Sequence, residues 1–139
     1  MANTTSPIGI TIPFRRGQNS GYFEQSFDTF TQKRMQIVNL LRTKIGERRM
    51  QPTFGSRLWN LAFEQNLDSL TSISSNIVRE DISRWISGVN INDVTTKIFK
   101  SDETNGDRDI YRLHISIVFT VNSTGQSDTM ELVIDSGKI

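Results

Sequence analysis

The sequence predicts an α+β domain in which N-terminal helices pack on one face of a three-stranded, or slightly larger, antiparallel C-terminal meander. Apolar residues recur at three- and four-residue steps in residues 28–45 and again in about 69–86, as in amphipathic helices. From residue 89 onward the period changes to two, which is typical of strands with one buried face. A chain of 139 residues is expected to form one hydrophobic core.

The chain is divided at its N-terminus, with residues 1–22 predicted as an extended arm and residues 23–139 as the single α+β domain. The arm is rich in Gly, Ser, Thr, Asn and Pro, and its middle alternates as in a short strand or an extended segment. The alternating apolar residues are Ile8, Ile10, Ile12 and Phe14. They are too few for a core of their own, so the arm either packs on its own domain or contacts a neighbouring subunit.

Three helices are predicted. The first is expected from Asp28 to Ile45, with Asp28 or Ser26 as its cap, and a short second helix follows Ser56. The third is expected from about residue 69 or 71 to 86, after a connection over residues 66–70, and Gly88 ends it. The residues predicted to face the core from the first and third helices are Phe27, Phe30, Ile37, Val38, Leu41, Ile45, Leu70, Ile73, Ile77, Ile82 and Trp85.

Three strands follow. The first, over residues 89–99, is less regular than its successors, and the polar segment 101–109 contains the hairpin dipeptide Asn105-Gly106. The clearest strand, residues 111–121, alternates apolar and polar residues. After a turn at residues 122–125, a third strand is predicted near residues 129–135, with its apolar residues on one face.

Residues 45–64 carry the most specific pattern, because Gly, Pro and Phe stand at fixed offsets between two helices. Gly46 is expected to be the left-handed residue directly after the first helix, and the segment from Glu47 to Arg49 is a charge cluster. Pro52 and Gly55 bracket Phe54, so the segment is predicted to be a shaped loop. Its arginine and aromatic residues are types enriched in interface hot spots, although the same residues can simply stabilise the helix junction.

The order of residues in this loop resembles the lysozyme-like baseplate wedge proteins of contractile-tailed phages and the sheath initiators of related contractile injection systems. The residues that carry the resemblance are Lys44, Gly46, Glu47, Arg48, Pro52, Phe54, Gly55, Leu58, Phe63 and Glu64. A looser similarity extends from about Phe27 to about Ile134. It implies a non-enzymatic structural protein of the virion tail baseplate, assembled in the host cytoplasm, that connects the wedge to the first sheath ring and initiates sheath assembly by β-strand addition.

The resemblance also implies partners and contact residues. The partners are the wedge proteins and the tail sheath subunit, with tube or hub proteins as candidates for the N-terminal arm and six copies per baseplate. Wedge docking is assigned to Gly46, Glu47, Arg48, Arg49, Pro52, Phe54, Gly55, Arg84 and Trp85. Sheath strand addition is assigned to Asp128, Thr129, Met130, Glu131, Leu132, Val133, Ile134 and Asp135. Where many relatives have Glu-Pro-Arg after the long helix, this chain has Ile86-Ser87-Gly88.

Composition excludes several classes of function. The absence of Cys excludes disulfides and thiolate metal sites, and the single residue His114 argues against a histidine-based zinc site. A net charge of +1, from 16 basic and 15 acidic residues, gives no sign of nucleic-acid or membrane binding. With no basic leader and no apolar run long enough to span a bilayer, the chain is expected to be soluble and made in a cytoplasm.

The alternative function is a baseplate-associated peptidoglycan hydrolase, a muramidase with Glu47 or Glu64 as its acid. The two arginines that follow Glu47 favour its ionised form, which is wrong for a general acid. No catalytic, cofactor-binding or metal-binding residues are therefore predicted, and no cofactor. A third hypothesis is a generic binding module without a role in a tail.

The acidic residues near the last strand either protect a sheet edge or leave it able to accept an arm from another chain.

Overall fold

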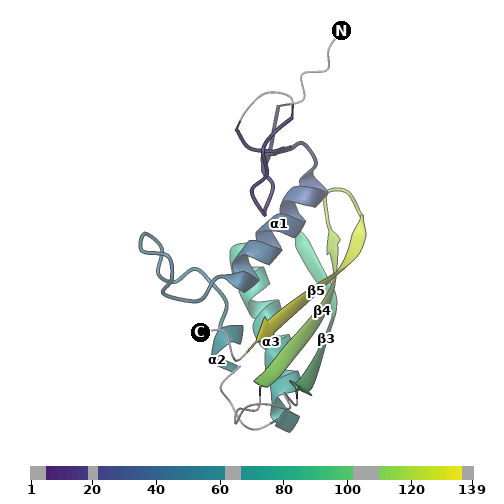
Figure 1. Ribbon diagram of the computed structural model, residues 1–139. Coiled ribbons are helices and arrows are strands. Elements are labelled where there is room, and N and C mark those ends of the chain that lie inside the picture. Colours follow the sequence, from purple (N-terminus) through teal and green to yellow (C-terminus); the bar gives the residue numbers. More distant parts are fainter. Residues whose placement is uncertain (1–5, 19–21, 62–66, 102–109, 136–139) are drawn as a thin grey trace.

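The computed structural model describes residues 6–18, 22–61, 67–101 and 110–135, and it confirms the predicted α+β class, with helices followed by a three-stranded antiparallel sheet (Figure 1). The elements, in chain order, are β1 (Gly9–Ile10), β2 (Gln25–Ser26), α1 (Thr29–Arg42), α2 (Leu58–Leu61), α3 (Leu67–Trp85), β3 (Val89–Ser101), β4 (Ile110–Val121) and β5 (Ser127–Asp135).

The main sheet has the order β3-β4-β5, with both neighbouring pairs antiparallel, so β4 is its central strand. The predicted alternation is confirmed, because every second residue of β4 and β5 is buried. The buried residues are Leu113, Ile115, Ile117, Phe119, Val121, Met130, Leu132 and Ile134. The less regular first strand is also confirmed by a register shift between Ile91 and Asp93. The predicted hairpin dipeptide Asn105-Gly106 lies outside the described residues.

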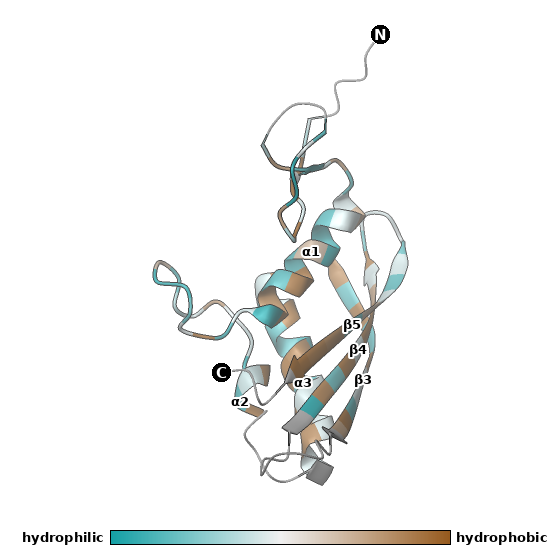
Figure 2. Ribbon diagram, viewed as in Figure 1, coloured by the Kyte–Doolittle hydropathy of each residue, from teal (hydrophilic) through white to brown (hydrophobic). Residues whose placement is uncertain are grey.

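The core lies between this face of the sheet and the helices, where the apolar segments of Figure 2 meet. Phe30 of α1 stacks on Phe119 of β4, with ring centroids 6.0 Å apart. Each fully buried aliphatic or aromatic side chain contributes about 1.5–3 kcal/mol. The buried helical residues are Ile37, Leu40, Leu41, Leu58, Leu61, Leu70, Val78 and Ile82. The opposite face of the sheet is therefore free for polar residues.

The first helix begins as predicted but ends earlier. Asp28 is its N-cap, and its carboxylate accepts the backbone N–H of Thr31 at 3.1 Å. The helix ends at Arg42 instead of Ile45, because Thr43 turns to an extended conformation (φ −89°, ψ 127°) and its hydroxyl donates to Asn39 O at 2.6 Å. The chain then runs beside Ser56, which leaves Ile45 48% exposed rather than in the core.

Two further core assignments and one helix boundary need correction. Phe27 lies before the helix and is 51% exposed. Helix α3 already begins at Leu67, so the predicted connection over residues 66–70 is wrong from that residue onward. Ile73 is 38% exposed, because Ser74 takes the adjacent buried position and donates its hydroxyl to Thr96 Oγ1 at 2.8 Å. A hydrogen bond between α3 and β3 thus overrides the apolar periodicity. Gly88, with φ +75°, follows the helix as expected.

The N-terminal segment forms a hairpin in which β1 pairs with β2. Strand β2 lies beyond residue 22, the predicted end of the arm. Ile8 N–H donates to Ser26 O at 2.8 Å, and Thr11 N–H donates to Glu24 O at 3.1 Å. Gly9 lies against the side chain of Gln32, where a side chain on residue 9 would collide. Of the four alternating apolar residues, only Ile10 is part of a strand, the two-residue β1, which lies beside the start of α1 (Figure 1).

A buried carboxylate joins the segment before α2 to α3. Asp81 is only 5% exposed, and its Oδ2 accepts from Ser56 Oγ at 3.0 Å and from Arg57 N–H at 3.2 Å. Its Oδ1 accepts from the Arg57 guanidinium at 3.1 and 3.2 Å. The hydrogen bond to Glu80 at 2.7 Å, with the charge of Asp81, raises the pKa of Arg57 above its ordinary value, so Arg57 stays cationic.

Replacing Asp81 by Ala is expected to lower the free energy of unfolding by about 2–3 kcal/mol, because the buried Ser56 hydroxyl loses its acceptor and Arg57 its charged partner. The measurement is urea denaturation followed by circular dichroism. Glu80→Ala is the matched control, since Glu80 also pairs with Arg57 but is exposed, and its loss should stay below about 1 kcal/mol. Equal losses in the two variants would contradict the structural role of Asp81.

Candidate functional site

The central loop, residues 43–56, leaves and rejoins the helical layer at nearly the same place and projects to one side of the molecule (Figure 1). Its base is closed by the hydrogen bond from Ser56 N–H to Thr43 O at 2.9 Å. Further along, Gly46 N–H donates to Pro52 O at 2.8 Å. The loop is thus held by its own backbone, as a shaped loop is expected to be.

Gly46 and Gly55 of the loop are required to be glycine for different structural reasons. Gly55 has φ +136°, and a Cβ there would lie 2.8 Å from backbone atoms of Thr43, Lys44 and Ile45. Gly46 has φ +89° but open space around it. Gly46 is left-handed as predicted, but it lies inside the loop and not directly after the helix. Gly55 lets two chain segments touch at the loop base.

The structure brings the loop motif together with the residue pair at the end of α3. The Arg48 guanidinium lies over the Phe54 ring, 4.0 Å from its centroid. Phe54 in turn meets Trp85 edge to face at 5.2 Å, and Arg84 lies 5.6 Å from the centroid of Trp85. Residues far apart in the sequence therefore form one cluster in which two aromatic rings in contact lie between two guanidinium groups, and we call it the Arg48–Trp85 stack.

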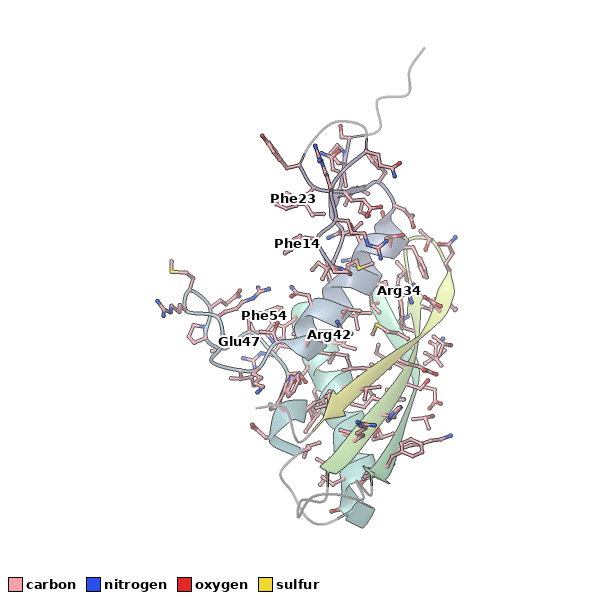
Figure 3. All side chains as sticks on the ribbon, in the orientation of Figure 1. Phe14, Phe23, Arg34, Arg42, Glu47 and Phe54 are labelled. Carbon is pink, nitrogen blue, oxygen red and sulfur yellow. The ribbon has the colours of Figure 1, made fainter. Side chains whose placement is uncertain are left out.

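The remaining loop residues predicted for docking are exposed. Arg49 and Pro52 lie on the outer part of the loop, beside Met50, which is 99% exposed. The Glu47 carboxylate accepts the backbone N–H of Lys44 at 3.0 Å, so it helps to fold the loop (Figure 3). Glu64, the other candidate acid, lies outside the described residues. Glu47 is exposed, unlike a general acid that is held in an apolar pocket.

Beside the stack is a surface hollow of about 340 Å³. It is lined by Lys33, Gln36, Asn39, Arg48, Phe54, Trp85, Ile86 and Ser87. The three residues from α1 were missed in the sequence, where they look like an ordinary solvated helix face. The turn at Thr43, which brings the loop back beside α1, is what makes them part of this surface.

The second candidate surface is the edge of the sheet at β5, which pairs with β4 alone among the described strands. The hydrogen bond from Val121 N–H to Gln126 O at 2.9 Å fixes which residue pairs of β4 and β5 are hydrogen-bonded. Because bonded and non-bonded pairs alternate, every second residue of β5 directs its backbone groups away from β4. These outward-facing residues are Thr129, Glu131 and Val133.

The start of this edge is already occupied. Asp128 Oδ1 accepts the outward N–H of Thr129 at 2.8 Å, and its Oδ2 lies 3.4 Å from Nε of Arg34 on α1 (Figure 3). The free part of the edge therefore begins after Thr129. At the other edge, Arg79 of α3 donates to the carbonyl of Ile91 at 2.9 Å beside the β3 bulge. Strand β5 offers the more open edge.

Side chains with catalytic potential also lie on the outer face of the sheet, where Lys97, His114, Ser116 and Glu131 line a hollow of about 350 Å³. His114 lies on the outer face of the sheet and packs edge to face on Phe99 at 4.7 Å. Across residues 6–18, 22–61, 67–101 and 110–135, no group of three His, Asp or Glu residues could hold a metal ion. In the same part of the chain, no helix is long and apolar enough to cross a membrane.

The sequence model of the family described as "Baseplate wedge protein gp25" matches residues 34–126, which include most of α1, the central loop, α2, α3, β3 and β4 but end before β5. No curated protein matches the chain.

Two solved structures share the fold, and a third is less similar. A Geobacter sulfurreducens protein named as a tail lysozyme has 23% identity and a TM-score of 0.63, over 77% of this chain and 90% of that chain. A chain of the anti-feeding prophage baseplate has 20% identity and a TM-score of 0.65, over 81% of this chain and 83% of that one. A chain of the type VI secretion baseplate complex has 11% identity and a TM-score of 0.41, over 72% of this chain and 85% of that one.

Gly55→Ala is expected to lower the free energy of unfolding by at least about 2 kcal/mol, since the new methyl group would collide with backbone at the loop base. Trypsin should also cut faster after Arg48 and Arg49, because the base of the loop opens. In the matched control Gly46→Ala, only the positive φ is strained, and the loss should be about 1 kcal/mol. A loop that tolerates both substitutions equally would contradict the close contact at Gly55.

Proposed function

Since the chain belongs to the family of the baseplate wedge protein gp25, we propose that it is a structural protein that joins the baseplate wedge to the first sheath ring. In this role it initiates sheath assembly by accepting a β-strand from the sheath subunit. Family membership supports a place in the baseplate of a contractile tail or a related injection system. Six copies per baseplate is the expectation carried over from the resemblance.

The observation that carries this proposal is the open edge of β5. Glu131 and Val133 direct their backbone N–H and C=O groups away from β4, with no further strand beside them in the described part of the chain. An added strand would satisfy those groups and extend the sheet. Because Asp128 occupies the Thr129 N–H, the added strand would pair from Glu131 toward the end of β5.

Wedge docking is assigned to the central loop and the Arg48–Trp85 stack. Arginine and tryptophan are among the residues that most often dominate binding energy at interfaces. Here their geometry is fixed before any partner binds, because Phe54 is held between the Arg48 guanidinium and the Trp85 ring. A preformed surface loses less conformational entropy on binding than a flexible loop does. Tube or hub proteins remain the candidates for the N-terminal hairpin.

Val133→Pro is expected to abolish seeding of sheath growth while the protein stays folded, because the lost N–H faces away from β4 and proline is tolerated on an open edge. Leu132→Pro should instead unfold the sheet, since its N–H faces β4 and its side chain is buried. The measurement is negative-stain imaging of purified sheath subunit with each variant, with circular dichroism as the folding check.

Val133→Thr, which keeps the N–H and the β-branched shape, serves as the control and should seed normally. Seeding by folded Val133→Pro at the wild-type level would rule out strand addition at this edge.

A non-enzymatic role is part of the proposal. The purified protein should release no soluble fragments from bacterial peptidoglycan, and neither should Glu47→Gln, which keeps an oxygen acceptor for Lys44 N–H and should stay folded. Peptidoglycan cleavage that disappears in Glu47→Gln would support the muramidase alternative instead.

A further inference from the structure

The hollow beside the central loop has an uneven distribution of charge. Lys33 and Arg48 line it, Arg84 lies over the adjoining Trp85 ring, and none of its lining residues is acidic. The ion pairs among the described residues lie elsewhere, between Arg34 and Asp128 and between Arg57 and the acidic pair of α3. The hollow therefore presents positive charge that the described part of the chain does not neutralise.

The geometry of Arg48 suits carboxylate recognition. Its guanidinium lies 4.0 Å from the centroid of the Phe54 ring. A guanidinium packed on an aromatic ring keeps its N–H groups available at its edges, and those groups match the two oxygens of a carboxylate. Arg48 is exposed, so its N–H groups can reach a ligand from solvent.

The rest of the hollow is apolar or neutral. Phe54 and Trp85 are half-buried, and Ile86 is buried beneath the surface. Gln36 and Asn39 add neutral amides from α1. A matching ligand would combine a carboxylate for Arg48 and Lys33 with an adjacent apolar side chain for the rings. Such a ligand is a protein segment rather than a small anion, because an anion would leave the apolar surface uncovered.

We propose that this hollow is the wedge-docking pocket and that its occupant is a segment of a wedge protein in which Asp or Glu is next to an apolar residue. This inference rests on the proposed function, because it names the chemistry of the partner at the same surface. The carboxylate lies between Arg48 and Lys33, and the apolar residue packs on Phe54 and Trp85.

The test uses the full chain and the purified wedge proteins encoded beside it. A carbodiimide activates a carboxylate as an O-acylisourea, and a lysine amine in contact then forms an amide while the reagent leaves as the urea, which carries away the elements of water. Mass spectrometry of the treated complex is expected to find Lys33 joined to an Asp or Glu of a wedge protein that has an apolar neighbour. A complex that forms without any such cross-link at Lys33 would overturn the proposal.

Matched variants give the second readout. Arg48→Gln should weaken wedge binding about tenfold or more, the scale of a lost charge-assisted hydrogen bond, and should reduce the salt dependence of binding. Arg42→Gln removes the same charge from an exposed residue at the end of α1, outside the central loop and the lining of the hollow, and should change affinity less than about twofold. Equal effects of the two variants would mean that only the general charge of this region matters, and would overturn the pocket.

The two hypotheses fail differently. If wild-type protein captures no wedge protein at all, the proposed function fails. If wild-type protein captures the wedge and Arg48→Gln does so equally well, with an unchanged melting temperature, the function stands and the acidic partner segment is wrong.

Discussion

The Asp81 carboxylate is the contact on which the arrangement of the two helical segments depends. It is buried and bonded to Ser56, which ends the central loop, and to Arg57, which begins the next segment. A buried carboxylate is costly unless its oxygens are satisfied, so the arrangement that supplies all of these donors is strongly preferred over others. Asp81 therefore fixes where the loop returns to α3. Gly55 then permits the direct contact of backbone segments at the loop base.

Because both ends of the central loop are fixed, its outer part keeps a defined conformation although it is exposed. Phe54 lies between Arg48 and Trp85, and Trp59 donates its ring N–H to Leu41 O at 3.1 Å, so aromatic residues anchor both sides of the junction. Loops placed on a rigid scaffold are common binding surfaces because position is set by the scaffold and chemistry by the loop. In this protein the scaffold is the junction of α1, α3 and the Ser56 segment.

The sequence predicted best those features that depend on local periodicity. Strands β4 and β5 follow a strict alternation because one face is buried and the other wet, and the Asp28 cap is a local bond. Features set by tertiary contacts were missed. Ser74, which is hydrogen-bonded to Thr96, occupies the buried position that was predicted for Ile73. The turn at Thr43 ends α1 before Ile45.

The candidate site also has a part that could be predicted from the sequence and a part that could not. The loop motif was visible because it uses unusual residues in a short span. Its neighbours Lys33, Gln36 and Asn39 are ordinary polar helix residues whose role appears only when the loop folds back beside α1. Asp81 is similar, since a carboxylate within a helix usually marks a solvated face.

Helix α1 connects the two candidate surfaces. Lys33 lines the hollow, and the next residue, Arg34, pairs with Asp128 at the start of the β5 edge. On the side of α1 that faces the core, Ile37, Leu40 and Leu41 are fully buried. Helix α1 is therefore held on the sheet along much of its length. In the proposed role the two contacts must be held in a fixed relation, or the β5 edge would meet the sheath strand at a variable position. Close packing of one helix between them meets that requirement without any conformational switch. Rigidity between the surfaces, together with distinct chemistry at each, is the property that suits this fold to the proposed adaptor role.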